Sequence, residues 1–110
     1  VQFLATHFNL TTEDARAAHT HALRLSCERG HLPVVQFLVA HLNLTTDDAR
    51  ADDNHALRLS CDNGHLPVVQ LLAAHFNLTA EDARALGNYA LRVSCERGHL
   101  PVVQFLSEHF

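Results

Sequence analysis

The chain has 110 residues, of which 47% are apolar, and it carries a net charge of -4. The apolar fraction is too high for a disordered chain, and the acidic balance excludes the broad basic face that nucleic acids or anionic membranes require. No apolar run approaches the roughly 18 residues of a membrane span. We therefore expect a globular protein with neither nucleic-acid nor membrane partners.

One motif, Gly-His-Leu-Pro-Val-Val-Gln, occurs three times along the chain. The copies start at Gly30, Gly64 and Gly98, with a spacing of 34 residues. A fixed period of this length is typical of solenoids, in which each unit buries its apolar face against its neighbours. The repeat therefore predicts a stack of similar helical units.

The repeats also divide the chain. Residues 18–51 align without gaps to residues 52–85, and 24 of the 34 positions are identical. Because the chain opens in mid-repeat, at the stub Val1-Gln2-Phe3-Leu4, we expect it to be a segment of a longer array. We predict a single repeat domain over 1–110, made of a partial repeat, two full repeats and a second partial repeat, over 1–17, 18–51, 52–85 and 86–110.

The residue pattern of each unit predicts two helices, and the middle repeat shows how. Asn54 is the predicted N-cap of a first helix over 55–63, and Gly64 ends that helix as a glycine beyond the last turn does. Pro67 opens the second helix, where a missing N–H costs nothing. That helix carries closely spaced apolar side chains and is expected to be well buried.

A short helical turn is predicted to join one unit to the next. Asn77 tolerates the left-handed conformation that ends the second helix. Thr79 then caps the turn with Asp82 three residues later, a capping-box pattern with Asp in place of Glu. Arg84 is placed to pair with Glu81. The same pattern recurs at Thr11/Asp14 and Thr45/Asp48. The Asn-Leu-Thr triplets also match the N-glycosylation pattern, which we treat as the minor alternative.

The three cysteines, Cys27, Cys61 and Cys95, share one repeat position. Equivalent backbones in neighbouring repeats lie roughly 8–10 Å apart, beyond the reach of a disulfide. We therefore predict free, small, buried residues, which fits an intracellular location in the cytoplasm or nucleus.

The residues resemble one known family. Gly-His-Leu-Pro-Val-Val-Gln-Leu-Leu resembles the second helix of the ankyrin repeat, and His-Ala-Leu-Arg-Leu-Ser-Cys resembles its first helix. The family's β-hairpin is replaced by Phe-Asn-Leu-Thr-Ala-Glu-Asp-Ala-Arg, where we expect the short helical turn. The resemblance implies an all-α, ankyrin-like α-solenoid of stacked helix-turn-helix repeats, with the first helices on the concave side. It also implies a protein–protein interaction scaffold.

No metal, cofactor or catalytic site is predicted. His31, His65 and His99 each follow a cysteine by four residues, but each repeat then offers only two ligands where a structural zinc needs four. These histidines resemble the family's turn histidine, which ties the inter-helix turn by hydrogen bonds. Polar residues recur once per repeat, as scaffold residues do, so we expect no enzyme. The row Arg24, Arg58 and Arg92 is expected to pair with the acidic residues four positions later, Glu28, Asp62 and Glu96.

The repeats differ most before and after the first helix. In the ankyrin family these places line the concave binding surface, so we predict that they bind a partner protein of unknown identity; neutral drift at exposed positions is the alternative. The alternative function is that of a structural spacer within a larger repeat protein, or of an engineered scaffold without a natural partner. In either case this surface would bind nothing. Apolar, uncapped terminal repeats also predict end-to-end self-association. The predicted partner-binding residues are His19, Thr20, His21, Glu28, Arg29, Asp52, Asp53, Asn54, His55, Asp62, Asn63, Asn88, Tyr89, Glu96 and Arg97.

Overall fold

The computed structural model describes the backbone of residues 12–110 and the side chains from Ala17 onward. Within this range all regular secondary structure is helical, without a strand, and none of the helices is long and apolar enough to cross a membrane. The predictions on residues 1–11, including the N-terminal stub and the N-cap at Thr11, lie outside the described residues. The helices are α2 (Thr12–Glu28), α3 (Leu32–His41), α4 (Thr46–Asp62), α5 (Leu66–His75), α6 (Ala80–Ala83), α7 (Ala85–Glu96) and α8 (Leu100–His109).

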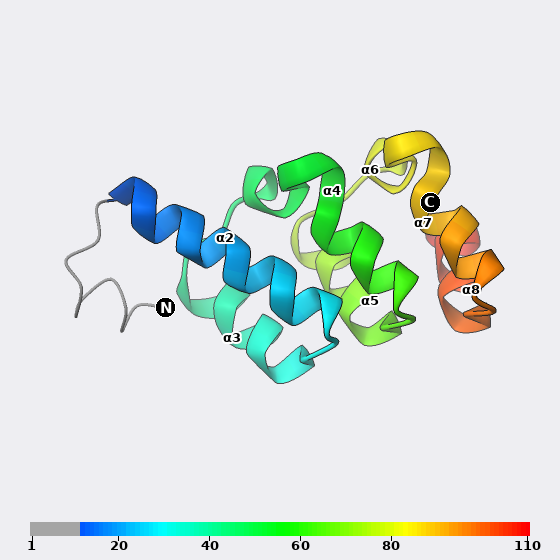
Figure 1. Ribbon diagram of the computed structural model, residues 1–110, viewed down its shortest axis with the longest axis horizontal. Helices are drawn as coiled ribbons and strands as arrows, with labels where there is room; N and C mark the ends of the chain where they lie inside the picture. Colours follow the sequence, from blue (N-terminus) through cyan, green and yellow to red (C-terminus); the bar gives the residue numbers. More distant parts are fainter. Residues whose placement is uncertain (1–11) are drawn as a thin grey trace.

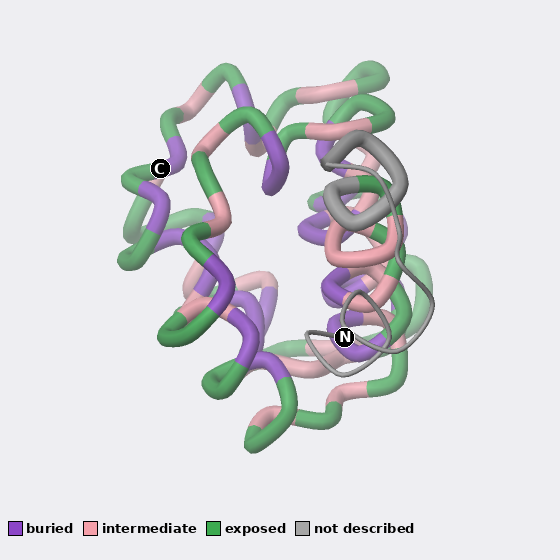
Figure 2. Tube along the Cα trace, turned by 90° about the vertical axis from the view of Figure 1, so that its left-hand side faces the viewer, coloured by how far each residue is buried: buried purple, intermediate pink, exposed green. Residues whose placement is uncertain are grey.

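The helices stack in two rows along the molecule (Figure 1). The first helices α2, α4 and α7 pack side by side in one row, and the second helices α3, α5 and α8 pack in the other. Each first helix also packs on its own second helix, and buried segments face one another between the rows (Figure 2). The predicted all-α, ankyrin-like stack is confirmed.

The core repeats with the period of the sequence. Leu23 and Leu57 are fully covered, as are Cys27 and Cys61 one turn later. Free cysteines were predicted, and all three are free. The prediction that all three are buried is wrong for Cys95, which is exposed because no further helix packs on that side of α7 in the described structure.

The turn between the two helices of a unit requires glycine for two reasons. Gly30 and Gly64 have φ of 72° and 71°, a conformation that side chains rarely adopt. The rings of His65 and His99 in the following repeats also lie against them. A Cβ at Gly30 would come within 2.5 Å of the His65 ring, and one at Gly64 within 2.6 Å of the His99 ring. The motif therefore couples each turn to the next repeat.

The two predicted capping boxes that lie within the described residues are present. The Thr45 side chain accepts from the Asp48 backbone N–H at 3.2 Å, and the Thr45 N–H donates to the Asp48 carboxylate at 2.8 Å. Thr79 and Asp82 form the same box before α6. The asparagine that ends each preceding helix is also as predicted, with a φ of 50° at Asn43. Short-range sequence chemistry thus determines the linker between units.

The prediction that Asn54 is an N-cap is wrong. The chain turns inside α4 through three consecutive left-handed residues, Asp52, Asp53 and Asn54, and Asn54 has a φ of 60° instead of the extended backbone of an N-cap. α7 contains the same left-handed turn over 86–88. Left-handed backbone is costly for most residues and least so for Gly, Asn and Asp, which accounts for five of the six residues in these two turns; Leu86, with a φ of 53°, is the exception.

The equivalent stretch of the first repeat differs. Ala18, His19 and Thr20 continue α2 as an unbroken helix of 17 residues. Thr20 is β-branched and stands where the other two repeats have asparagine, so the left-handed conformation is unfavourable there. α2 therefore runs straight where α4 and α7 bend (Figure 1).

Candidate functional site

The predicted binding residues follow the row of first helices, and we call them the first-helix surface. Two of them, Asn54 and Asp62, are buried and hold the scaffold together instead of facing solvent. Five are partly covered: His19, Thr20, Glu28, His55 and Tyr89. Eight are exposed: His21, Arg29, Asp52, Asp53, Asn63, Asn88, Glu96 and Arg97.

Two arginines brace the left-handed turns. Arg58 donates from Nε to the carbonyl of Asp53 at 2.8 Å and from its terminal nitrogen to the carbonyl of Asp52 at 3.1 Å. Arg92 does the same to the carbonyls of Gly87, at 2.9 Å, and Leu86, at 3.3 Å. The forked guanidinium therefore supplies partners to carbonyls that the broken helix leaves without an intrahelical bond.

These contacts correct the predicted pairing of the arginine row. No described arginine of the row pairs with the acidic residue four positions later. Arg24, whose helix has no left-handed turn, instead pairs with Asp52 of the next repeat. Arg58 and Arg92 bind the carbonyls of the left-handed turn instead of the acidic residues, because an exposed i,i+4 ion pair contributes little to stability.

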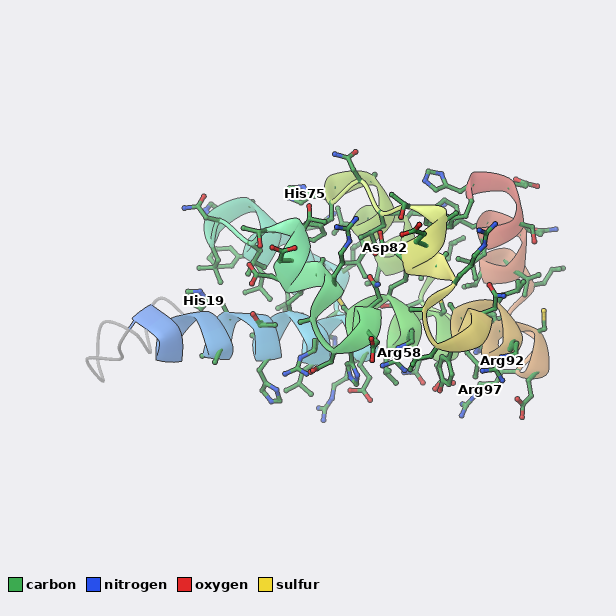
Figure 3. All side chains as sticks on the ribbon, turned by 90° about the horizontal axis from the view of Figure 1, so that it is seen from above. His19, Arg58, His75, Asp82, Arg92 and Arg97 are labelled. Carbon is green, nitrogen blue, oxygen red and sulfur yellow. The ribbon has the colours of Figure 1, made fainter. Side chains whose placement is uncertain are left out.

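Tyr89 lies between the two bracing arginines. Its ring centre is 5.2 Å from the guanidinium carbon of Arg58 and 6.0 Å from that of Arg92, within the range of cation–π contact. Its hydroxyl donates to the Asp62 carboxylate at 3.3 Å, and Arg97 Nε contacts the same carboxylate at 2.7 Å. Arg58, Arg92 and Arg97 therefore lie along one edge of the molecule, as Figure 3 shows.

Burial lowers the pKa of two histidines on this surface. For His19 the loss of solvation is the largest cause, and its Nε2 has no hydrogen-bond partner among the described residues. For His55 the loss of solvation is reinforced by the charges of Arg58 and Arg24. Both imidazoles are therefore favoured in the neutral form near neutral pH.

A second polar cluster, which the sequence did not predict, joins neighbouring repeats at Asp82. Arg50 binds this carboxylate with Nε at 2.8 Å and its terminal nitrogen at 3.1 Å, and Asn54 donates to it at 3.1 Å. Burial acts to raise the pKa of Asp82, but hydrogen bonds from Arg50, Thr79 and Asn54 outweigh it and lower the pKa below its usual value. The signal in the sequence was an arginine two residues after every capping aspartate.

The motif histidines connect repeats. His99 Nε2 donates to the carbonyl of Asp62 in the preceding repeat at 2.9 Å. Hydrogen bonds that tie the inter-helix turn were predicted for these histidines, and His99 makes one to the last residue before that turn in the preceding repeat. No group of three or more His, Cys, Asp or Glu residues in the described part of the chain is arranged to hold a metal.

The chain matches the family model for ankyrin repeats, three copies, over residues 1–82. The match spans well over half of the sequence, so the chain belongs to the ankyrin repeat family, whose members are general protein–protein interaction modules and are typically not enzymes. No curated protein and no solved structure matches it.

Proposed function

We propose that this protein binds a partner protein through the exposed residues of the first-helix surface, and that it has no catalytic activity of its own. The observation that carries the proposal is the contrast within this surface. Asn54 and Asp62 are held by contacts inside the scaffold, whereas eight other residues of this surface are exposed at places where the repeats differ.

Three exposed charges are suited to direct contact. The side chains of Arg29, Asp53 and Glu96 have no ion pair with another described residue, and they lie on three different repeats. The backbone that carries these side chains is fixed by the repeat stack, so little backbone freedom is lost on binding. The pattern of one basic and two acidic groups then favours a partner of complementary charge arrangement.

The proposal is tested by placing a photo-crosslinking residue at Arg29, Asp53 or Glu96. Positions Gln36, Gln70 and Gln104 on the exposed side of the second helices are the matched controls. We expect the same partner to crosslink from the first-helix positions and not from the controls. Equal crosslinking from both sets would contradict the proposed surface.

Affinity for the crosslinked partner then measures the contribution of each charge. Arg29→Gln, Asp53→Asn and Glu96→Gln remove one charge each with little change of shape. We expect the triple variant to bind at least about tenfold more weakly, since charged contacts at an interface contribute on this scale. Unchanged affinity would contradict the proposed contact by these three charges, whereas the absence of any crosslinked partner would favour a structural spacer or a scaffold without a natural partner.

We also propose an intracellular location for the protein. The support is that all three cysteines are free, with two of them in the core. Free core thiols at repeating positions suit a reducing compartment.

A further inference from the structure

The two junctions between first helices differ in how they treat the arginine row. At the junction of α2 and α4, Arg24 forms an ion pair with Asp52, the first residue of the left-handed turn in the next repeat. One period of 34 residues later, at the junction of α4 and α7, the same two positions hold Arg58 and Leu86. The Arg58 guanidinium has no carboxylate partner in the described part of the chain. The second junction therefore carries a positive charge that the first junction neutralises.

The Arg58 guanidinium is also fixed in place. Its Nε donates to the carbonyl of Asp53 at 2.8 Å, a terminal nitrogen donates to a second carbonyl of the same turn at 3.1 Å, and the ring centre of Tyr89 lies 5.2 Å from the guanidinium carbon. Its other terminal nitrogen has no hydrogen-bond partner among the described residues. Arg84 is different: its predicted pairing with Glu81 is absent, and no hydrogen bond from a described residue orients its exposed side chain. Arg58 thus presents an oriented, unused donor.

Leu86 is an apolar residue at a place that suits a polar one. It is 52% exposed, and its φ of 53° is a conformation that Asp, Asn and Gly adopt more easily than leucine. The position stays open where a further repeat packs beside it, because the Asp52 side chain, which has such a neighbour, is 66% exposed. The second junction therefore combines an exposed apolar side chain with an unpaired cation.

From this combination we infer that Arg58 and Leu86 bind a segment of the partner protein in which an aspartate or glutamate adjoins an apolar residue. The carboxylate takes the place that Asp52 has at the first junction and accepts from the unused terminal nitrogen of Arg58. The apolar side chain packs on Leu86, while Tyr89 keeps the guanidinium in position. The inference rests on the proposed function and names the chemistry of the partner at one point beside the first-helix surface.

The surrounding charges favour an anion at this junction. Arg92 lies 6.0 Å from the ring centre of Tyr89 and adds a second cation near Arg58. The carboxylate of Asp62 is engaged by Arg97 and by the Tyr89 hydroxyl, so it does not neutralise Arg58. A carboxylate that meets a prepositioned guanidinium forms a charge-assisted hydrogen bond. A small inorganic anion would use the charge alone, whereas an acidic segment with an apolar neighbour also covers the exposed leucine.

The first test selects ligands for the whole chain from displayed random peptides of about a dozen residues. We expect the enriched peptides to share an aspartate or glutamate next to an apolar residue. Replacement of that acid by its amide should weaken binding roughly tenfold in fluorescence anisotropy, because the charge-assisted bond to Arg58 is lost. Failure to enrich any peptide, or enrichment of peptides without a common acid, would overturn the inference.

Two variants at one position separate charge from shape. Leu86→Asp gives the second junction the residues of the first, so its carboxylate should occupy Arg58 from within the chain. Leu86→Asn has nearly the same shape without the charge. We expect Leu86→Asn to weaken the enriched peptide a few-fold and Leu86→Asp to weaken it roughly tenfold more. Equal affinities of the two variants would contradict the role of Arg58.

Both variants are expected to remain folded. Each replaces a left-handed leucine by a residue that tolerates this backbone, so both should melt at or above the temperature of the parent protein. Weaker binding then reports the site and not unfolding.

The partner crosslinked from Arg29, Asp53 or Glu96 distinguishes this inference from the proposed function. If that partner binds Leu86→Asp as tightly as Leu86→Asn, the inference fails and the first-helix surface stands. If no partner crosslinks from those positions while the enriched peptide still distinguishes the two variants, the proposed function fails and the peptide site stands. A peptide with phosphoserine in place of its acid that binds more than about tenfold tighter would overturn the assignment to a carboxylate.

Discussion

Among single residues, the three cysteines differ most despite their shared position. Burial raises the pKa of the Cys27 and Cys61 thiols to about 12, with the Asp62 charge adding to the effect at Cys61. The reactive thiolate is therefore scarce at both sites at neutral pH, whereas Cys95 is exposed. The repeat position of a cysteine therefore does not by itself determine how reactive its thiol is, because the same position is buried in two repeats and exposed in the third.

We expect one thiol to react rapidly with a disulfide reagent at pH 8 in the native protein, and three after unfolding in guanidinium. The reason is that the reagent needs an accessible thiolate, which only Cys95 provides. Counting released chromophore over time measures the effect. Cys95→Ser should abolish the rapid phase, and equal rates for all three thiols would contradict the burial of Cys27 and Cys61.

A replacement of Asp82 is expected to lower the stability of the protein considerably, even when the new side chain has nearly the same size. Asp82→Asn should lower the free energy of unfolding by about 1–3 kcal/mol, because the cap and the buried carboxylate contacts are both weakened. Urea unfolding at pH 7 measures this change. Glu81→Gln, an exposed neighbour, should stay within about 0.5 kcal/mol of the parent and is the control.

The same carboxylate predicts a dependence on pH. Its pKa is lower in the folded protein than in the unfolded chain, so the contribution is fully present above the unfolded pKa and is lost as the pH falls through the folded one. The difference between the parent and Asp82→Asn should therefore shrink below about pH 4. A difference that stays constant down to pH 2 would be inconsistent with an ionised Asp82 in the folded state.

At the scale of the helix, the left-handed turn depends on the residue that braces it. Arg58→Lys should destabilise the protein by about 1 kcal/mol, because a lysine lacks the fork that reaches two carbonyls. Arg24→Lys is the matched control. Its effect should be smaller, since α2 has no such turn and the pair with Asp52 lies at the surface. Thermal unfolding of both variants checks the ranking.

The straight form of α2 is attributed to three side chains, which a replacement can test. Substituting Ala18→Asp, His19→Asp and Thr20→Asn gives the first repeat the residues of the second. We expect the Cα chemical shifts of 18–20 to leave the helical range and Arg24→Lys to become as costly as Arg58→Lys. If α2 stays unbroken, the cause of the difference lies outside these three positions.

The sequence predicted the elements better than the contacts between them. Gly64, Pro67 and the Thr79–Asp82 box act within a few residues, so their spacing identifies helix ends and caps directly. The bracing of the turn by Arg58 and the binding of Asp82 by Arg50 join residues that meet only once the chain has folded. The same limit applies to Asn54, whose side chain donates a hydrogen bond to Asp82, 28 positions away along the chain. The binding role of the exposed first-helix residues stays a prediction.

At the scale of the whole molecule, both ends of the stack carry exposed apolar side chains. Phe37 is 56% exposed on α3 and Leu100 is 60% exposed at the start of α8. Exposed apolar side chains of this kind tend to associate. Self-association of this 110-residue chain through Phe37 and Leu100 stays a prediction.

Sedimentation velocity over a range of concentrations tests it. We expect the mean mass to rise with concentration, and to stay at that of a monomer in Leu100→Glu or Phe37→Glu. Gln70→Glu, which adds the same charge in the middle of the stack, should behave as the parent does. A parent protein with a constant monomer mass at every concentration would show that these ends do not associate.

The double use of Asp82 has a consequence for how the stack unfolds. In a repeat array the free energy is close to a sum of a term for each repeat and a term for each junction, and cooperativity grows with the share held by the junctions. Asp82 contributes to both, since it caps α6 within its own repeat, where Asn54 also binds it, and it binds Arg50 of the neighbouring repeat. Opening the junction weakens the cap, and fraying of the cap weakens the junction. The two repeats therefore lose their structure together, and fraying that starts at one end does not stop at this boundary.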